Sequence, residues 1–149
     1  MIESEEIVSG GYIHVVAAVI WQPGSSDRFL ISKRQKGKHL QDYWELPGGK
    51  IESGESRRQA LDRELREEID IVPVKARAFQ QVRHQYKDRN ILLDVWEVTS
   101  FKGNVVAREG QEVRWVAVDQ LAKYRFPAAD LTILESIANN AKVKTAHLP

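Results

Sequence analysis

The stretch that decides the fold is residues 49–71, which read GKIESGESRRQALDRELREEIDI. From Ser56 to Ile69 the apolar residues Leu61, Leu65 and Ile69 recur at steps of four, which predicts one helix with a single apolar stripe. The remaining positions of this segment are mostly charged. We therefore expect a helix that buries the stripe and presents its charged side to solvent or to a ligand.

Three carboxylates lie beside that stripe, because Glu64, Glu67 and Glu68 fall at positions i, i+3 and i+4 of the predicted helix. Like charges at these spacings repel, and each pair weakens a helix by about 0.2–0.5 kcal/mol. A bound cation would remove the repulsion. Because the available donors are hard oxygens, the pattern favours Mg²⁺ or Mn²⁺, held between carboxylates and substrate phosphates, over zinc. Such a site supports pyrophosphate chemistry.

A plain alternative is a solvated helix in which Arg63 forms an ion pair with Glu67. The preceding segment, Leu46–Lys50, weighs against it. Gly48 and Gly49 allow unusual backbone angles and a close approach of the chain to a ligand, so that a carbonyl can turn toward a metal. Loop and helix together favour a metal–phosphate site.

Composition excludes several other classes of protein. The chain has 149 residues, 42% of them hydrophobic, which suits one globular domain with a sizeable core. With 22 basic and 21 acidic residues the net charge is +1, so we expect no binding to a nucleic-acid polymer, while a free nucleotide remains a possible substrate. The longest apolar run, Val15–Trp21, is too short to span a membrane, and residues 1–6 lack a signal core. We expect a soluble cytoplasmic protein, either a monomer or a homodimer.

The remaining chain predicts alternating strands with one further helix. Residues 12–21 read as a strand covered on both faces, and residues 28–34 as its partner across a turn. Residues 78–86 and 91–101 read as a hairpin, and residues 112–118 as a last strand. Pro127 suits the first turn of a final helix. The expected core stripe of that helix is Leu131, Leu134, Ile137 and Ala141.

The order of Gly49, Glu55, Arg63–Glu64 and Glu67–Glu68 resembles the Nudix box, with Asp70 where the family carries glycine. The resemblance covers roughly residues 12–138 and points to the MutT-type branch, which hydrolyses nucleoside triphosphates and removes oxidised nucleotides from the precursor pool. Four further segments look like their MutT counterparts: Leu30–Arg34, Trp44–Glu52, Glu109–Gln111 and Phe126–Asp130.

This resemblance implies an α+β fold, a Nudix-type α/β/α sandwich around a central mixed sheet. One domain would span residues 1–149, with a core at about 12–141 and flexible ends.

The resemblance also implies roles for individual residues. Water would attack the β-phosphorus of a nucleoside triphosphate and release the monophosphate and pyrophosphate, with Glu64 or Glu109 as general base. Arg63 and Glu55 would orient the helix carboxylates, and Lys50 would meet a substrate phosphate. Arg34, Leu46 and Asp130 would contact the rest of the substrate. The implied metal ligands are the Gly48 carbonyl, Glu64, Glu67, Glu68 and Glu109.

Asp130 leaves the nucleobase open, because the best-known MutT pattern has Asn at this position. An amide both donates and accepts hydrogen bonds, whereas an ionised Asp only accepts. It would suit N4 of cytosine or the N7–H of 8-oxoguanine, and would repel a carbonyl oxygen. The first hypothesis is therefore 8-oxo-dGTP hydrolysis, and the second is a CTP- or dCTP-preferring, or broad, diphosphatase. A third is a non-catalytic nucleotide-sensing module, although the complete acidic set argues against it.

Asp70 is expected to end the box helix in the left-handed conformation, where glycine is the better residue. We expect a stability cost of about 1 kcal/mol relative to Gly, without loss of activity.

Overall fold

A mixed β-sheet forms the centre of the fold in the computed structural model, which describes residues 7–8, 11–37 and 40–146. The expectation of flexible ends falls largely on residues outside these ranges. The strands are β1 (Ile7–Val8), β2 (Tyr12–Ile20), β3 (Arg28–Lys33), β4 (Trp44–Glu45), β5 (Gly48–Lys50), β6 (Val72–Gln85), β7 (Asn90–Lys102) and β8 (Val113–Ala117). The helices are α2 (Arg57–Ile69), the 3-10 helix η1 (Val118–Lys123) and α3 (Ala128–Ala146).

Strand β2 is hydrogen-bonded along both of its edges. It runs parallel to β7, from Ile13 opposite Ile91 to Ile20 opposite Val98. Its other edge pairs antiparallel with β1 and then with β5. β6 pairs antiparallel with β7, so the order across this five-stranded sheet is β1-β2-β7-β6. A separate three-stranded sheet has the order β4-β3-β8.

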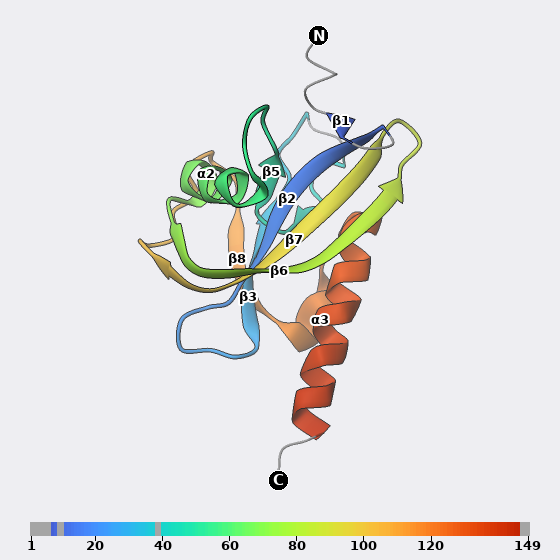
Figure 1. Cartoon of the computed structure of the whole chain (residues 1–149). Coiled ribbons are helices and arrows are strands. Elements are labelled where there is room, and N and C mark those ends of the chain that lie inside the picture. The colour runs from blue at the N-terminus through green and yellow to red at the C-terminus, as the bar shows by residue number, and fades with distance from the viewer. Residues whose placement is uncertain (1–6, 9–10, 38–39, 147–149) are drawn as a thin grey trace.

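The two faces of β2 belong to two different cores. Ala17 and Val19 pack in the core cluster that contains buried residues of α3, whereas Val16 and Ala18 pack in the cluster that contains the apolar stripe of α2. Helices α2 and α3 therefore cover opposite faces of the sheet (Figure 1). This confirms the predicted α/β/α sandwich with a central mixed sheet.

The strand predicted at residues 28–34 does not form a full hairpin with β2. One isolated bridge, between Trp21 and Phe29, joins the two segments, and β3 pairs instead with β4 and β8. β7 occupies one edge of β2, and β1 and β5 occupy most of the other, so β3 belongs to a separate sheet. The predicted pairing was wrong, although the strand itself is present.

The predicted hairpin is confirmed but is longer than expected, because β6 begins at Val72 rather than at residue 78. Register shifts interrupt its pairing with β7 between Pro73 and Lys75, between Lys75 and Ala76, and between Ala78 and Gln80. Each shift breaks the alternation of buried and exposed side chains. The two-residue period that identifies a strand from sequence is therefore missing from this part of β6.

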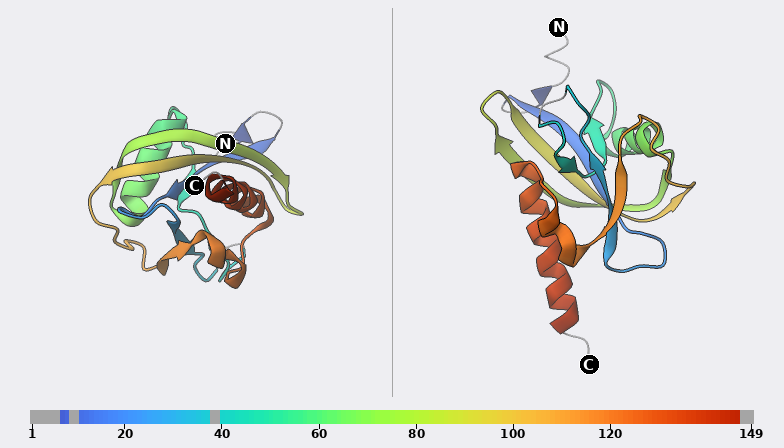
Figure 2. Two further views of the ribbon diagram at one scale, coloured as in Figure 1. Left: turned by 90° about the horizontal axis from the view of Figure 1, so that it is seen from below. Right: turned by 180° about the vertical axis from the view of Figure 1, so that it is seen from behind.

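Helix α3 lies beneath the curved strands β6 and β7, and its C-terminal turns extend past them (Figure 2). Leu134 and Ile137 are buried as predicted, but Leu131 is 48% exposed. Ile133 occupies the core instead, so the buried stripe is rotated relative to the predicted one. The side chain of Ala141, the last member of the predicted stripe, lies outside the described part.

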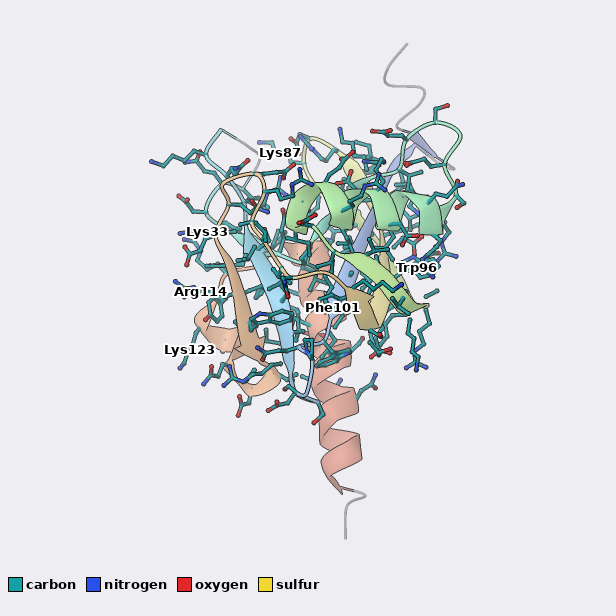
Figure 3. All side chains as sticks on the ribbon, turned by 90° about the vertical axis from the view of Figure 1, so that its left-hand side faces the viewer. Lys33, Lys87, Trp96, Phe101, Arg114 and Lys123 are labelled. Carbon is teal, nitrogen blue, oxygen red and sulfur yellow. The ribbon has the colours of Figure 1, made fainter. Side chains whose placement is uncertain are left out.

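Helix α2 begins after Ser56, whose hydroxyl accepts from the Gln59 amide while the Gln59 side chain accepts from the Ser56 amide. This capping box satisfies two amide groups that a helix start otherwise leaves without a partner. The predicted apolar stripe of α2 is confirmed, since all three of its residues are fully buried. Below the helix in Figure 3, Trp96 and Phe101 of β7 flank this core.

None of the helices in the described ranges combines the length and the apolar character needed to cross a membrane.

The end of α2 provides a test of the predicted stability cost. Asp70 has φ 61° and ψ 37°, the left-handed conformation expected for it. Asp70→Gly should raise the free energy of unfolding by about 1 kcal/mol, because glycine adopts these angles without strain. The ion pair lost with Arg108, at 3.7 Å on the surface, should matter little.

Thermal and urea unfolding would measure this change. Asp62→Gly is the matched control, because the same substitution inside α2 should lower stability slightly: glycine is the poorer helix former by about 0.3 kcal/mol, and the surface ion pair with Arg58 is lost. Equal destabilisation by both variants would contradict the proposed strain at Asp70.

Candidate active site

The segment before α2 approaches the sheet and the helix so closely that two positions have no room for a side chain. Gly48 lies opposite Ala17 in the β2–β5 pairing, and a Cβ added there would stand 2.0 Å from the Val16 carbonyl oxygen. A Cβ added to Gly49 would stand 2.4 Å from the carboxyl group of Glu64. Gly48 and Gly49 therefore allow the chain to pass between the sheet edge and the helix carboxylates.

Arg63 holds four groups around one guanidinium. Its Nε donates to Glu55 at 2.6 Å, and one terminal nitrogen donates to Glu64 at 2.8 Å and to Glu67 at 3.3 Å. The other terminal nitrogen donates to the Lys50 carbonyl at 3.0 Å and to Glu55 at 2.9 Å. The side chain is only 14% exposed. The structure thus places Arg63 between Glu55 and the helix carboxylates, and the orienting role of both residues stays a prediction.

The carboxylates that share Arg63 have different electrostatic environments. Hydrogen bonding from Arg63 lowers the pKa of Glu55, whereas burial raises the pKa of Glu64 and outweighs its own bond to Arg63. The negative charges of Glu67 and Glu109 also raise the pKa of Glu64. Glu64 is therefore the more basic of the two carboxylates.

Glu68 is a buried carboxylate at the last turn of α2, with 7% of its surface exposed. It accepts a hydrogen bond from the Gly48 amide at 3.1 Å. Burial, reinforced by the charges of Glu45 and Glu109, raises the pKa of Glu68 to about 8. With Glu64 of the same helix, which also raises this pKa, three acids act on one carboxyl group.

Asp130 lies at the start of α3 and is also buried, with 7% of its surface exposed. The Leu46 amide donates to its carboxyl group at 3.4 Å. Burial raises the pKa of Asp130 to about 7, and the charge of Glu45 adds to the effect. Glu45 itself accepts from Arg34 at 2.5 Å.

Glu45 is the residue that the sequence analysis missed. It acts on both Glu68 and Asp130 and pairs with a predicted substrate-binding residue, Arg34. The only signal in the sequence was its place inside the MutT-like run of residues 44–52. The contact with Arg34 depends on how β3 and β4 pair, which the sequence did not predict.

Two cations hold the start of β4 in place. Lys33 of β3 and Arg114 of β8 lie at the same side of the small sheet in Figure 3, and both stand over the indole ring of Trp44. The distances to the ring centroid are 5.9 Å and 5.2 Å. Because Trp44 directly precedes Glu45, this packing also fixes where Glu45 enters the site.

These groups surround one pocket of about 420 Å³. Eight of the residues predicted to form the site line it: Arg34, Leu46, Gly48, Lys50, Glu64, Glu68, Glu109 and Asp130. The other three, Glu55, Arg63 and Glu67, do not line it. Glu55 and Arg63 stand behind Glu64, and Glu67 is 52% exposed beside Arg63. Tyr86 and Arg89, which had no predicted role here, also line the pocket.

The oxygen atoms that line the pocket suit a divalent cation that is coordinated by the protein and by a bound ligand together. Within the described ranges, no three carboxylate or imidazole groups converge closely enough to hold an ion by themselves. Mg²⁺, however, commonly uses one or two carboxylates, several waters and the substrate phosphates. Burial raises the pKa of Glu64 and of Glu68, and nearby carboxylates add to the rise. A bound cation would favour the charged form of both groups.

Fold and site together define the class of this protein. A family model described as the NUDIX domain matches residues 16–136, which is most of the chain. The chain belongs to the Nudix hydrolase family. Members of this family generally use a divalent metal.

The chain is similar to relatives that have two different activities. The CTP pyrophosphohydrolase of Escherichia coli K12 is 36% identical, over 83% of this chain and 90% of the relative. The 8-oxo-dGTP diphosphatase of the same organism is 33% identical, over 75% of this chain and 87% of the relative. A solved structure from a study of MutT from Aliivibrio salmonicida and Vibrio cholerae is 38% identical, has a TM-score of 0.75, and covers 85% of this chain and 97% of its own.

The contact between Gly49 and Glu64 generates a test of the site. In Gly49→Ala the methyl group should push the Glu64 carboxyl away from its place beside Arg63, so we expect a loss of about a hundredfold in kcat and only a modest fall in Tm. Steady-state hydrolysis of a nucleoside triphosphate and thermal unfolding would measure the two effects.

Gly54→Ala is the matched control. Gly54 has φ 84° and open space around it, so the variant should lose about 1 kcal/mol of stability and keep its activity. If Gly49→Ala loses stability and retains kcat, the placement of Glu64 does not depend on Gly49.

Proposed function

We propose that this protein hydrolyses a nucleoside triphosphate to the monophosphate and pyrophosphate with Mg²⁺ or Mn²⁺. The leading candidate for its substrate is 8-oxo-dGTP. The observation that carries the proposal is one pocket lined by Glu64, Glu68 and Glu109 and also by the buried Asp130. The acidic residues suit a metal-bound triphosphate. Asp130 is a buried polar group that can recognise a base.

The residues of this chain would divide the work as follows. Glu64, Glu67, Glu68, Glu109 and the Gly48 carbonyl would hold the metal, which when bound screens phosphate charge and activates water. Arg63, which donates to both Glu55 and Glu64, would keep Glu64 oriented, and Glu55 would hold Arg63 in place. Lys50 lines the pocket and would neutralise phosphate charge.

Glu64 is our first choice for the group that accepts the proton from the attacking water. Glu64 lines the pocket, and Arg63 donates to its carboxyl group at 2.8 Å, which would keep it in place to accept the proton. Glu109 is the alternative, because it lines the same pocket from a different segment. Attack at the β-phosphorus would break the bond to the α-phosphate oxygen and leave pyrophosphate and the nucleoside monophosphate.

Asp130 would recognise the base, with Arg34 and Leu46 beside it. With a pKa of about 7, its carboxyl group is protonated in a large fraction of molecules at neutral pH. A protonated carboxyl group donates one hydrogen bond and accepts another, which is what an asparagine does. It can therefore donate to the O6 carbonyl of 8-oxoguanine and accept from its N7–H.

The ionised form of Asp130 supports a second candidate, a preference for cytidine triphosphates. A carboxylate accepts from the N4 amino group of cytosine. The similarity to a CTP pyrophosphohydrolase also supports this candidate. In either case we propose a single cytoplasmic domain, monomeric or homodimeric, that acts on free nucleotides and, with 8-oxo-dGTP, would contribute to DNA repair by cleaning the nucleotide pool.

The direct test is pyrophosphate release with Mg²⁺ from 8-oxo-dGTP, dGTP, CTP, dCTP, diadenosine tetraphosphate and ADP-ribose. Glu68→Gln is the control for the site, because it removes a buried carboxylate and should reduce turnover of every substrate. The highest kcat/KM with 8-oxo-dGTP would support the first candidate, and the highest with CTP or dCTP the second. No turnover of any nucleotide by the wild type would refute both and favour a sensing module.

The charge of Asp130 gives a further expectation, in which base preference depends on pH. Below a pH of about 7 the neutral acid can donate to a carbonyl, and above it the carboxylate cannot. The ratio of kcat/KM for 8-oxo-dGTP to that for dCTP should therefore fall between about pH 6 and about pH 8.5. Asp130→Asn should hold the ratio high and nearly constant across that range.

Asp119→Asn is the matched control, because Asp119 is an exposed acid of η1. This variant should follow the wild-type pH dependence. If wild type and Asp130→Asn show the same ratio at every pH, Asp130 does not read the base.

A further inference from the structure

The segment that carries Glu109 is attached to the C-terminal end of α2. The last carbonyls of a helix have no partner within the helix and need one elsewhere. Here the Ile69 carbonyl accepts from the Val106 amide, and the Glu68 carbonyl accepts from the Arg108 amide, each at 3.0 Å. The loop that follows β7 thus supplies the missing donors for the box helix.

One side chain adds a second connection between the same two segments. Gln111 is 8% exposed, and its carboxamide is bonded at both ends. Its nitrogen donates to the Glu68 carbonyl at 3.0 Å, and its oxygen accepts from the Glu109 amide at 3.0 Å. Gly110 has φ 75°, a left-handed turn that allows Gln111 to fold back onto Glu109.

We propose that Gln111 is a positioning residue for hydrolysis, which fixes Glu109 relative to Glu68 through their backbones. The proposal rests on the proposed function, because it assumes that Glu109 acts in the pocket. The Glu109 side chain is exposed and lies on a loop, so contacts of this side chain with the rest of the protein would do little to fix its position. A buried amide bridge between the two backbones removes much of that freedom.

The chemistry of this bridge requires an amide of this length. Gln111 must donate to a carbonyl and accept from an N–H at the same time, and glutamine does both with one planar group. Methionine has similar length and volume but does neither. Gln111→Met therefore removes the bridge while keeping most of the packing.

Hydrogen exchange of the free protein tests the bridge without reference to catalysis. In Gln111→Met the Glu109 amide should exchange about fivefold to tenfold faster than in the wild type. Ser56→Ala is the matched control, since it removes the N-cap of the same helix at its opposite end and should lower Tm. In this control the exchange of Glu109 should stay near the wild-type rate. Unchanged exchange in Gln111→Met would overturn the proposal.

Kinetics of a double-mutant cycle test whether Gln111 acts through Glu109. Gln111→Met should lower kcat about tenfold and leave KM within about twofold of the wild-type value. Added to Glu109→Gln, the same substitution should lower kcat little further. Ser56→Ala should keep kcat. If the losses in kcat caused by Gln111→Met and Glu109→Gln multiply in the double variant, Gln111 does not act through Glu109, and the proposal is overturned. An equal loss of kcat in Ser56→Ala would also overturn it, because the effect would then come from a general loss of stability.

The two readouts separate this proposal from the proposed function. If the wild type hydrolyses no nucleotide, the proposed function fails, and with it the catalytic part of this inference. Hydrogen exchange would still show whether the bridge orders Glu109. If the wild type is active but the cycle is additive, only the role of Gln111 fails.

Discussion

The arrangement of the site depends on one guanidinium group. Three carboxylates one turn apart on α2 would repel one another, and Glu55 would add a fourth charge from the preceding loop. Arg63 bonds three of these acids and also the Lys50 carbonyl of β5. A planar fork with five donors can do this, whereas the single ammonium group of lysine could not reach the same acceptors. Removing Arg63 would leave partly buried carboxylates without a partner, which costs far more than an exposed ion pair contributes.

Unlike electrostatic environments lie next to one another, in the pocket and directly behind it. Hydrogen bonding from Arg63 lowers the pKa of Glu55 behind the pocket, while burial raises those of Glu64, Glu68 and Asp130, which line it. The site thus combines a group suited to remain charged with groups suited to exchange protons. For the two helix carboxylates the burial arises where β5 approaches α2, because Gly49 lies against Glu64 and the Gly48 amide donates to Glu68. Fold and chemistry are therefore linked through backbone packing.

The sequence could predict features that depend on residues close together along the chain, but not features that depend on contacts between distant segments. The spacing of Leu61, Leu65 and Ile69 was enough to place α2, because a long regular stripe has few alternatives. On α3, Leu131 looked equivalent to Leu134, and only the contacts of the folded helix distinguish them. The positions of the helix carboxylates followed from the same spacing. The role of Glu45 did not, because it arises from strand pairing between distant segments.

The parallel pairing of β2 with β7 has a consequence for how the protein folds. Ile13 and Ile91 are neighbours in the sheet, although about eighty residues separate them along the chain. Closing so long a loop costs entropy before any contact of the sheet repays it, and such topologies fold slowly. The hairpin of β6 and β7 can form early, but β5 and α2 find their places only when β2 has docked. We expect the carboxylates to assemble in that late step, so that a folding intermediate would already contain the hairpin and still lack the active site.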